Sequence, residues 1–429
     1  MQPTEKYTAS KPVSSERQSW AFGDFFALWT SLGIGLAVLQ TGALLGPGLG
    51  LAQSFMMILV GSVIGAALIA TVGWFSQRHG LSSMALMQQT LGFKGAYVPA
   101  CMNFIQLIGW GAFEIVLMRN AVTQLIEQWW PGATWLTIPL VWTLLFGALA
   151  TWQAIQGPLT WVRVFLRRVG IWIVVAGCAG LTYYWFAHYS LNQFWQQAGD
   201  GSMPQALGLD IVISMAVSWL PLVGDYSRFG KSSGHTFNGT AFGYLIGTVW
   251  IMTLGAAYQV VLPAGSSSTQ LMLSLGVAFS GIPLLMVLFD ETENAFAPIH
   301  SSAVSASLVV RWPISYLAMF FGVVSTVVAW CVPTDAYLDF LLWIGSVFTP
   351  LFALLMVDHF SSKQLRTPGK FQVCSALVAW LLGVVTYHMM TSYYPDIGAT
   401  LPTLVVSATV YGILRWLVSC FGYHVKQHS

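Results

Sequence analysis

The stretch VLFDETENAFAPIH, residues 287–300, places three carboxylates inside a hydrophobic run. On an α-helix Asp290, Glu293 and Asn294 share one face, because they are three and four residues apart, whereas Glu291 points about 100° away. An ionised carboxylate is costly to expose to lipid, so we expect this face to look into a helix bundle or an aqueous cavity. There the carboxylates could bind a small cation or hold a proton.

Two further residue types bear on the acidic stretch. Thr292 would add a hydroxyl oxygen beside Glu293, and a backbone carbonyl exposed near Gly33 could supply further oxygens to a Na⁺ ion. Alternatively, the acids could pair with buried bases. The alternative is weak, because Arg119 is the only basic residue that we expect away from the inner face of the membrane.

The stretch NFIQLIGWGAFEIVLMRN places Gln106, Trp110 and Glu114 at successive four-residue intervals, on one stripe of a helix. The Gln amide offers a donor and an acceptor to the edge of a heterocycle, and the indole offers a face for stacking. Glu114 could take a proton or accept a substrate N–H. The alternative is a polar seam that holds neighbouring helices together.

Such residues need a scaffold, and the composition predicts a membrane bundle. Of the 429 residues, 56% are hydrophobic and only 7% are charged. A soluble domain cannot bury that much apolar surface, whereas runs of about 20 apolar residues match the hydrocarbon layer of a bilayer. The five cysteines are scattered without metal or redox spacing. Twelve spans are predicted, at roughly 25–50, 53–76, 95–124, 134–156, 158–187, 206–229, 236–262, 279–309, 313–332, 335–358, 371–391 and 399–421.

The basic residues predict the orientation, because Lys and Arg are retained on the cytoplasmic side. With twelve spans and the amino terminus inside, every one of the 17 Lys and Arg residues except Arg119 falls on or near the inner face. We therefore expect a multi-pass protein of the plasma or inner membrane with both termini cytoplasmic. Residues 1–20 would form a cytoplasmic tail, and residues 21–429 a single transmembrane domain.

Two of the predicted spans carry helix-breaking residues near their middle. Gly33 and Gly35 interrupt the first, and Ser214, Ser218 and Pro221 interrupt the sixth. Glycine loosens the backbone and proline removes a donor, so each helix could unwind near mid-membrane. Paired breaks in corresponding halves are typical of a transporter's central site, although Gly and Pro are also common in ordinary membrane helices. The spacing suggests two five-helix repeats, 25–187 and 206–358, followed by two further helices in 371–421.

Five motifs, in the same order along the chain, resemble the nucleobase:cation symporter-1 family, which includes cytosine permeases and hydroxymethylpyrimidine transporters. They are SWLPLVGDYSRFGK, LAVLQTGALLGPGLG, QLIGW, ETENAFAPIHSSAVS and GSVFTPLFALLMVDHF. The resemblance covers the chain from the first span to the twelfth. It implies an all-α polytopic membrane protein with the leucine-transporter fold, that is, two inverted five-helix repeats plus two C-terminal helices. It also implies import driven by an ion gradient.

The resemblance implies most of the site residues, and Gly35, Glu114 and Asp290 are added from the residue patterns described above. A substrate ring would contact residues of the first, third, sixth and eighth spans, namely Gly35, Gln106, Trp110, Glu114, Ser218, Trp219 and Asn294. A coupling cation would bind at Ser31, Ile34, Asp290, Thr292 and Glu293. Three departures stand out: Gln106 and Trp110 are spaced differently from the cytosine permease pattern, Pro298 stands where relatives place an amide or a carboxylate, and Glu293 stands where sodium-coupled relatives carry a hydroxyl. The carboxylate of Glu293 could strengthen a sodium site or replace it with a protonatable group.

Together these observations predict a secondary active importer of a nucleobase or related pyrimidine, such as cytosine or hydroxymethylpyrimidine. The expected partners are a small heterocyclic substrate, a coupling Na⁺ or H⁺ and the lipid bilayer, with no cofactor and no nucleic acid. The alternatives are a channel, which would need a polar lining on several helices, and a membrane-embedded enzyme, which would need a nucleophile with a base or a metal cluster.

Overall fold

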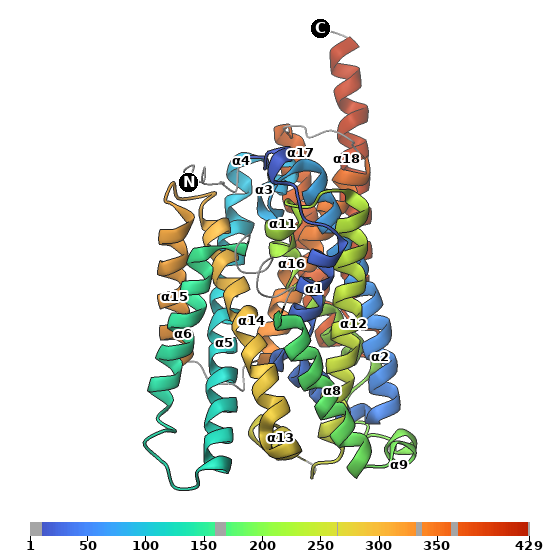
Figure 1. Ribbon diagram of the computed structural model, residues 1–429. Coiled ribbons are helices and arrows are strands. Elements are labelled where there is room, and N and C mark those ends of the chain that lie inside the picture. The colour runs from blue at the N-terminus through green and yellow to red at the C-terminus, as the bar shows by residue number, and fades with distance from the viewer. Residues whose placement is uncertain (1–10, 159–168, 264, 332–336, 362–367, 428–429) are drawn as a thin grey trace.

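The apolar runs of the sequence form helices that lie side by side in one bundle (Figure 1). The computed structural model describes residues 11–158, 169–263, 265–331, 337–361 and 368–427. The long or membrane-level helices are α1 (Phe22–Gly33), α2 (Leu36–His79), α5 (Tyr97–Trp129), α6 (Pro139–Gln156), α8 (Ile171–His188), α10 (Gln205–Val217), α11 (Leu220–Ser227), α12 (Ser233–Val260), α14 (Ile282–Ala306), α15 (Ile314–Cys331), α16 (Tyr337–Ser361), α17 (Lys370–Tyr393) and α18 (Thr400–Gln427). Shorter helical segments are η1 (Ser15–Arg17), α3 (Ser83–Leu86), α4 (Gln88–Gly95), α9 (Leu191–Gln196), α13 (Ser268–Val277) and η3 (Ala278–Gly281).

Helix α2 contains the second part of the first predicted span and all of the second, because the chain turns within it at Gly50. A continuous helix of its 44 residues would be about 66 Å long, roughly twice the hydrocarbon thickness of a bilayer. Gly50 has a φ of 73°, and a Cβ there would lie 2.6 Å from the carbonyl oxygen of Gln197. Only glycine fits this position. The predicted spans 25–50 and 53–76 therefore meet at a glycine turn.

The helical membrane architecture is confirmed, while the count of twelve crossings stays a prediction. Ten helical stretches of the described residues are long and apolar enough to cross a membrane. These ten count α2 as one stretch and leave out α6. The short polar stretch after α2 forms α3 and α4 rather than a further long helix, and α13 occupies a segment that the hydropathy pattern left as a connection.

The first span is broken at the predicted place. Helix α1 ends at Gly33 and α2 begins at Leu36, with Ile34 and Gly35 extended between them at φ values of −109° and −150°. Extended backbone cannot continue the helical hydrogen-bond ladder, so its N–H and C=O groups must find other partners. The break therefore creates a polar spot inside the bundle.

The sixth span is also interrupted where predicted, but more mildly. Helix α10 ends at Val217 and α11 begins at Leu220. Between them Ser218 and Trp219 keep right-handed helical dihedrals, with φ values of −60° and −85°. Pro221, in the first turn of α11, has no N–H to donate to the carbonyl of Val217. The interruption is thus a local loss of helical hydrogen bonds rather than an extended linker.

Glycines bring α12 close to α1 and α2. A Cβ on Gly255 of α12 would lie 1.9 Å from the carbonyl oxygen of Leu39, and a Cβ on Gly42 of α2 would lie 1.9 Å from the carbonyl oxygen of Met252. A Cβ on Gly247 would lie 2.6 Å from the carbonyl oxygen of Thr30. Small residues at such a crossing let two helix backbones touch, which is a common way of packing helices in lipid. Helix α12 therefore packs along both halves of the broken first span.

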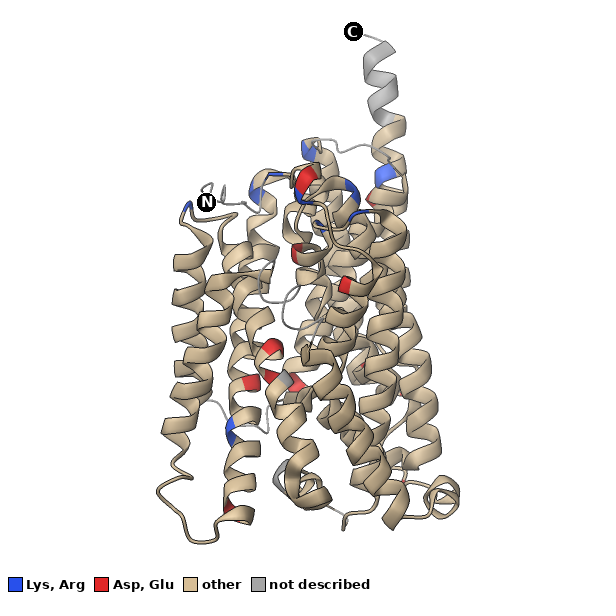
Figure 2. Cartoon of the chain, in the orientation of Figure 1, with Lys and Arg blue, Asp and Glu red and all other residues tan. Residues whose placement is uncertain are grey.

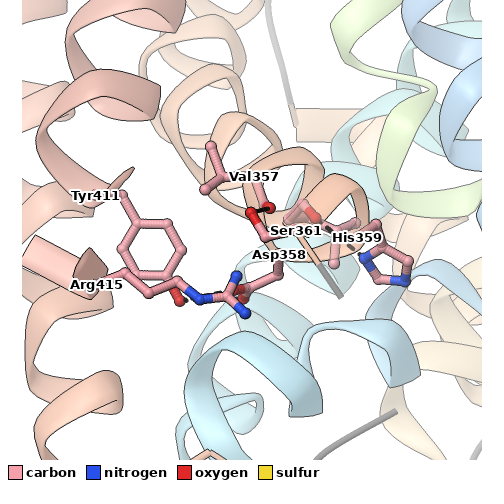
Figure 3. Close-up of polar contacts among 7 residues, drawn as sticks. Val357, Asp358, His359, Ser361, Tyr411 and Arg415 are labelled. Atoms are coloured by element: carbon pink, nitrogen blue, oxygen red, sulfur yellow. Dashed lines mark hydrogen bonds and ion pairs between the residues drawn. The ribbon is translucent and has the colours of Figure 1, made fainter. Parts of the chain in front are cut away.

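Two buried carboxylates from other helices fasten helix α18, one near its middle and one at its N-terminus. Near the middle, Asp358 of α16 pairs with Arg415, and the Tyr411 hydroxyl lies 3.0 Å from both oxygens of the same carboxylate (Figure 3). At the N-terminus, Asp210 of α10 accepts from the backbone N–H of Thr400 at 2.9 Å. A carboxylate at a helix N-terminus is favourable because the first N–H groups have no partner within the helix. The last helix thus joins α10 to α16.

Charge is distributed unevenly along the bundle. Figure 2 shows that most Lys and Arg lie at the end that carries both ends of the chain, whereas several Asp and Glu lie in the middle. At the end of the bundle where Lys and Arg gather, backbone hydrogen bonds attach the amino-terminal segment. The backbone N–H of Trp20 donates to the Phe229 carbonyl at 3.0 Å, and the Trp20 carbonyl accepts from the backbone N–H of Lys231 at 2.8 Å. Trp20 is fully buried against Phe25 and Phe229. Residues 11–20 therefore pack against the bundle rather than extending away from it.

Candidate functional site

A small buried cavity lies at the level of the two helix interruptions. It has a volume of about 10 Å³, room for about one water molecule. Side chains of α5, of the α10–α11 junction and of α14 form its wall: Leu107, Trp110, Glu114, Ser218, Trp219, Leu222, Asn294 and Pro298. The structure thus brings together five of the predicted substrate contacts. A heterocyclic ring would fit only if these side chains moved apart.

Two indoles form much of the wall of the cavity. Trp110 packs edge-on against Tyr337 and Phe340, with ring centroids 6.0 and 5.6 Å away. Trp219 packs edge-on against Trp29 at 5.9 Å. Within the described part of the chain, neither cavity indole has a hydrogen-bond partner for its Nε1–H. Each indole is therefore held by its neighbours while its donor remains available to a ligand.

A pair of carboxyl groups lies between the cavity and the first break. The side chains of Glu114 and Glu291 lie next to each other. The two oxygens of Glu291 also accept from the Leu36 N–H, at 3.1 and 3.0 Å, at the point where α2 begins. Two neighbouring buried carboxylates repel each other, so the pair is stable only when a proton or a cation offsets their charge. The pair therefore connects the cavity to the first break.

Glu291 is the residue that the sequence placed wrongly. The helical wheel left it about 100° from Asp290, off the face expected to meet the bundle interior, yet its side chain is 0% exposed and bonded to the first break. The missed signal was its spacing from Asn294, because residues three apart share a helix face. Asn294 itself donates to the Ile34 carbonyl at 3.4 Å.

Both backbone groups of Ile34, in the first break, already have partners. The Ile34 N–H donates to the Ser31 carbonyl at 2.9 Å, and the Ile34 carbonyl accepts from Asn294. Gly35 lies against the same side chain: a Cβ there would come 3.0 Å from Nδ2 of Asn294 and 3.5 Å from Oε1 of Glu291. The predicted contacts Ser31, Ile34 and Gly35 therefore surround the break, beside the cavity rather than in its wall.

The other predicted cation contacts do not gather at one point. The Thr292 hydroxyl accepts from Gln153 of α6 at 3.1 Å and donates to the Phe289 carbonyl at 3.2 Å. It faces α6, whereas Glu291 faces the first break. Glu293 is 3% exposed, so the expectation that its carboxylate is kept from lipid is confirmed. The side chain of Asp290 lies outside the described residues. This arrangement does not present Thr292 and the Ile34 carbonyl as joint ligands of one Na⁺ ion.

Gln106 lies next to the cavity and supports its wall. Its amide donates to the carbonyl of Ser218 at 3.3 Å and to Oδ1 of Asn103 at 2.9 Å. Asn103 in turn donates to the Ser305 hydroxyl of α14 at 2.7 Å. These hydrogen bonds join α5, α14 and the interruption of the sixth span. They lie on the side of the cavity that faces the end of the bundle carrying both termini. Sequence patterns did not identify Asn103 or Ser305.

The opposite side of the cavity is closed by α16. The Tyr337 hydroxyl lies 2.6 Å from Oγ1 of Thr41 and donates to the Ala37 carbonyl at 3.3 Å, both on α2. Its ring stacks on Phe113 with centroids 4.5 Å apart. Tyr337 thus bridges α16, α2 and α5 over Trp110. The cavity is therefore covered on both sides.

A larger cleft exists, but it lacks the features of a central site. It has a volume of about 570 Å³ and lies at the surface, between the last turns of α5 and the segment around α13. It lies at the end of α5 away from the helix interruptions. No group of His, Cys, Asp and Glu that could hold a metal ion occurs in the described part of the chain. The small buried cavity remains the candidate site.

Comparisons with known proteins agree with this geometry. Residues 12–419 match the family described as permeases for cytosine/purines, uracil, thiamine and allantoin. A Bacillus subtilis (strain 168) protein named as a purine-cytosine permease is 23% identical over 391 residues, covering 84% of this chain and 79% of its own. The cytosine permease of Escherichia coli (strain K12) is 20% identical over 399 residues, covering 89% and 87%.

Solved structures show the same fold. Mhp1, described as a nucleobase-cation-symport-1 family transporter in a closed conformation with bromovinylhydantoin bound, superposes with a TM-score of 0.82 at 16% identity, covering 96% of each chain. The inward-facing conformation of Mhp1 gives a TM-score of 0.78 at 14% identity, covering 98% of this chain and 96% of that one. The fold of this chain is that of the leucine-transporter-like membrane proteins.

Proposed function

Because the chain belongs to the nucleobase:cation symporter-1 family, we propose that it imports a flat nitrogen heterocycle, a nucleobase or related pyrimidine, through the cavity between its interrupted helices. The protein is a secondary active transporter and not an enzyme. The observation that carries the substrate proposal is the cavity itself. It combines two indoles, a carboxyl and an amide at the level of both interruptions. Stacking faces and a few polar edge groups are what a flat heterocycle requires.

We assign the substrate contacts to the cavity wall. Trp110 and Trp219 supply stacking faces, and Glu114 and Asn294 supply polar contacts to the ring edge. The Gln106 amide donates to the Ser218 carbonyl, so its role is to hold the cavity wall in place rather than to contact the substrate. Gly35 lets α14 approach the first break, since a larger residue would press against Asn294.

For the coupling cation, the geometry supports a proton more than a sodium ion. The buried carboxyls of Glu114 and Glu291 lie next to each other, an arrangement that a shared proton stabilises, and they link the cavity to the N-terminus of α2. Thr292 faces α6, away from the carbonyl groups of the first break. A cation drives uptake only if it binds the outward-open state with a different affinity from the inward-open state. The carboxyl pair touches both α2 and α5, whose separation would change between those states.

We also propose that both termini lie in the cytoplasm and that the protein resides in the plasma or inner membrane. The concentration of Lys and Arg at the end that carries both termini supports this orientation (Figure 2). Arg119 lies on the distal half of α5 and bonds the Thr143 hydroxyl at 3.3 Å. In this orientation Tyr337 closes the outer side of the cavity. The hydrogen bonds that Gln106 makes with Ser218 and Asn103 close the inner side.

The test is uptake of radiolabelled cytosine into proteoliposomes, with pH and Na⁺ gradients imposed separately. We expect saturable uptake that accumulates with an inward proton gradient, and Trp110→Ala should reduce it about 10-fold or more, since stacking on an aromatic contributes about 1–3 kcal/mol. Phe93→Ala, which removes an exposed aromatic outside the cavity, is the matched control and should retain uptake. Uptake driven by the Na⁺ gradient alone would overturn the proton assignment. Absence of saturable uptake for every nucleobase would overturn the proposed function.

A further inference from the structure

The first helix break leaves the N-terminus of α2 beside the cavity, and Glu291 occupies that end. The first N–H groups of a helix have no partner within the helix, and the helix dipole adds positive charge there, so such an end attracts anions. Here the Leu36 N–H donates to both oxygens of Glu291, at 3.1 and 3.0 Å. Glu291 is fully buried, and a Cβ at Gly35 would lie 3.5 Å from its Oε1. A ligand anion would therefore find this position taken by a carboxylate of the protein.

A second carboxyl brings negative charge to the wall of the cavity itself. Glu114 lines the cavity, is buried and lies next to Glu291. The two carboxyls carry two negative charges when they hold no proton, and one when they share a proton. In a buried site such a charge acts over several Å, because water and salt screen it little. With either occupancy, the pair therefore places negative charge at the cavity.

The described residues of the cavity wall include no Lys, Arg or His that could offset this charge. Arg119 lies further along α5 and faces other helices: it donates to the Thr143 hydroxyl at 3.3 Å and to the Ala329 carbonyl at 3.4 Å. The indole N–H groups of Trp110 and Trp219 are neutral donors. They suit the carbonyl oxygens of a ring, but they do not cancel a charge.

We propose that the Glu114–Glu291 pair excludes anionic heterocycles, so that the cavity accepts neutral rings and rejects their carboxylated counterparts. The proposal rests on the proposed function and specifies the charge of the substrate. An entering anion would lose its hydration and meet a charge of its own sign, without a cation or a free helix N-terminus to compensate it. A neutral ring loses no ion hydration and is not repelled. Because the repulsion acts through space, it should depend little on where the ring carries its anionic group.

The test compares heterocycles of nearly equal size that differ in charge. Cytosine-5-carboxylate and uracil-6-carboxylate are each paired with the corresponding carboxamide, and each compound competes with radiolabelled cytosine for the purified full-length protein. For the wild type we expect each carboxylate to bind at least about 10-fold more weakly than its carboxamide, because like charges about 10 Å apart at an effective dielectric constant of about 20 repel by that factor or more.

The double variant Glu114→Gln/Glu291→Gln removes the charge and keeps side chains of similar size. The amide oxygen at position 291 can still accept from the Leu36 N–H. Each carboxylate should then bind within a factor of about 3 of its carboxamide, because the like-charge repulsion is gone. This change is a gain of carboxylate affinity, which damage to the fold would not produce. Glu127→Gln removes an exposed carboxylate from the same helix as Glu114 and should keep the wild-type ratio.

The outcomes separate this proposal from the proposed function. If the wild type binds neither cytosine nor any other nucleobase, the proposed function fails. If the wild type binds the carboxylates as tightly as the carboxamides, or if the double variant keeps the wild-type ratio, the exclusion by charge is wrong while transport stands. If no carboxylate or carboxamide competes in any of the proteins, size excludes them and the proposal is overturned.

Should the double variant not fold, the wild type alone decides. Weaker binding of the carboxylate at both ring positions supports repulsion through space. Weaker binding at only one ring position would indicate a local contact and would overturn the proposal.

Discussion

At the residue scale, two of the backbone polar groups at the first break are satisfied by side chains of one helix. Asn294 of α14 bonds the Ile34 carbonyl, and Glu291, one turn earlier, bonds the Leu36 N–H. The sequence allowed Asn294 to be predicted on the buried face of α14. It could not determine which of the neighbouring carboxylates shares that face. Asp290 and Glu291 are both about one turn from Asn294, so spacing alone cannot say which faces the break. Packing of the whole bundle decides that.

Tyr337 provides a residue-level prediction about the closed state. Tyr337→Phe removes the hydroxyl that contacts Thr41 and Ala37 across the cavity cover. The closed arrangement should lose about 1–2 kcal/mol, because each buried hydrogen bond contributes about 0.5–1.5 kcal/mol. We expect bound cytosine to dissociate about 5- to 30-fold faster, measured by dilution of the radiolabelled complex.

Tyr258→Phe is the matched control. Its hydroxyl is buried and donates to the Leu181 carbonyl at 2.9 Å, away from the cavity. This variant should lower thermal stability to a similar extent without changing the dissociation rate. If the two variants release cytosine at the same rate, Tyr337 does not act as the outer cover.

At the scale of elements, glycine has three different roles that the sequence does not distinguish. Gly35 lies in the break of the first span, Gly50 forms a turn with positive φ, and Gly42 and Gly255 permit close contact between α2 and α12. Hydropathy and glycine positions predicted the break, because two glycines interrupt an apolar run. The contact with α12 could not be predicted, since it depends on which backbone lies opposite each glycine.

The glycine contact predicts a strong effect of a small substitution. Gly255→Ala places a methyl group 1.9 Å from the Leu39 carbonyl oxygen, so α12 and α2 must separate. Overpacking of this kind costs about 1–3 kcal/mol. We expect a lower apparent melting temperature in detergent and a loss of uptake.

Gly412→Ala is the corresponding control on α18, because nothing lies within 4 Å of a Cβ at Gly412. Alanine is a better helix former than glycine, so this variant should be neutral or slightly stabilising. A melting temperature for Gly255→Ala equal to that of Gly412→Ala would contradict the close packing of α12 on α2.

At the scale of the whole molecule, the bundle surrounds the candidate cavity and covers it on both sides. Tyr337 joins α16 to α2 on one side, and Gln106 joins α5 to the α10–α11 junction on the other. The helical membrane architecture and the two interruptions could be predicted from apolar run length and helix-breaking residues. The covers could not, because Tyr337, Asn103 and Ser305 carry no local signal and matter only through the residues that the fold places opposite them. Alternating access requires that the two covers open in turn.

Whether the cavity opens to each side in turn can be measured by labelling its wall. Ser218 lines the cavity between α10 and α11, and cysteine is only slightly larger than serine, so Ser218→Cys should fold in a background with the five native cysteines replaced by serine. A membrane-impermeant thiol reagent applied to oriented vesicles should label Cys at position 218 from the outer side and, under different gradients, from the inner side, and cytosine should protect it. Alternating access through this cavity would be contradicted if the thiol never reacted from either side, or if it reacted at the same rate with and without cytosine and with either gradient.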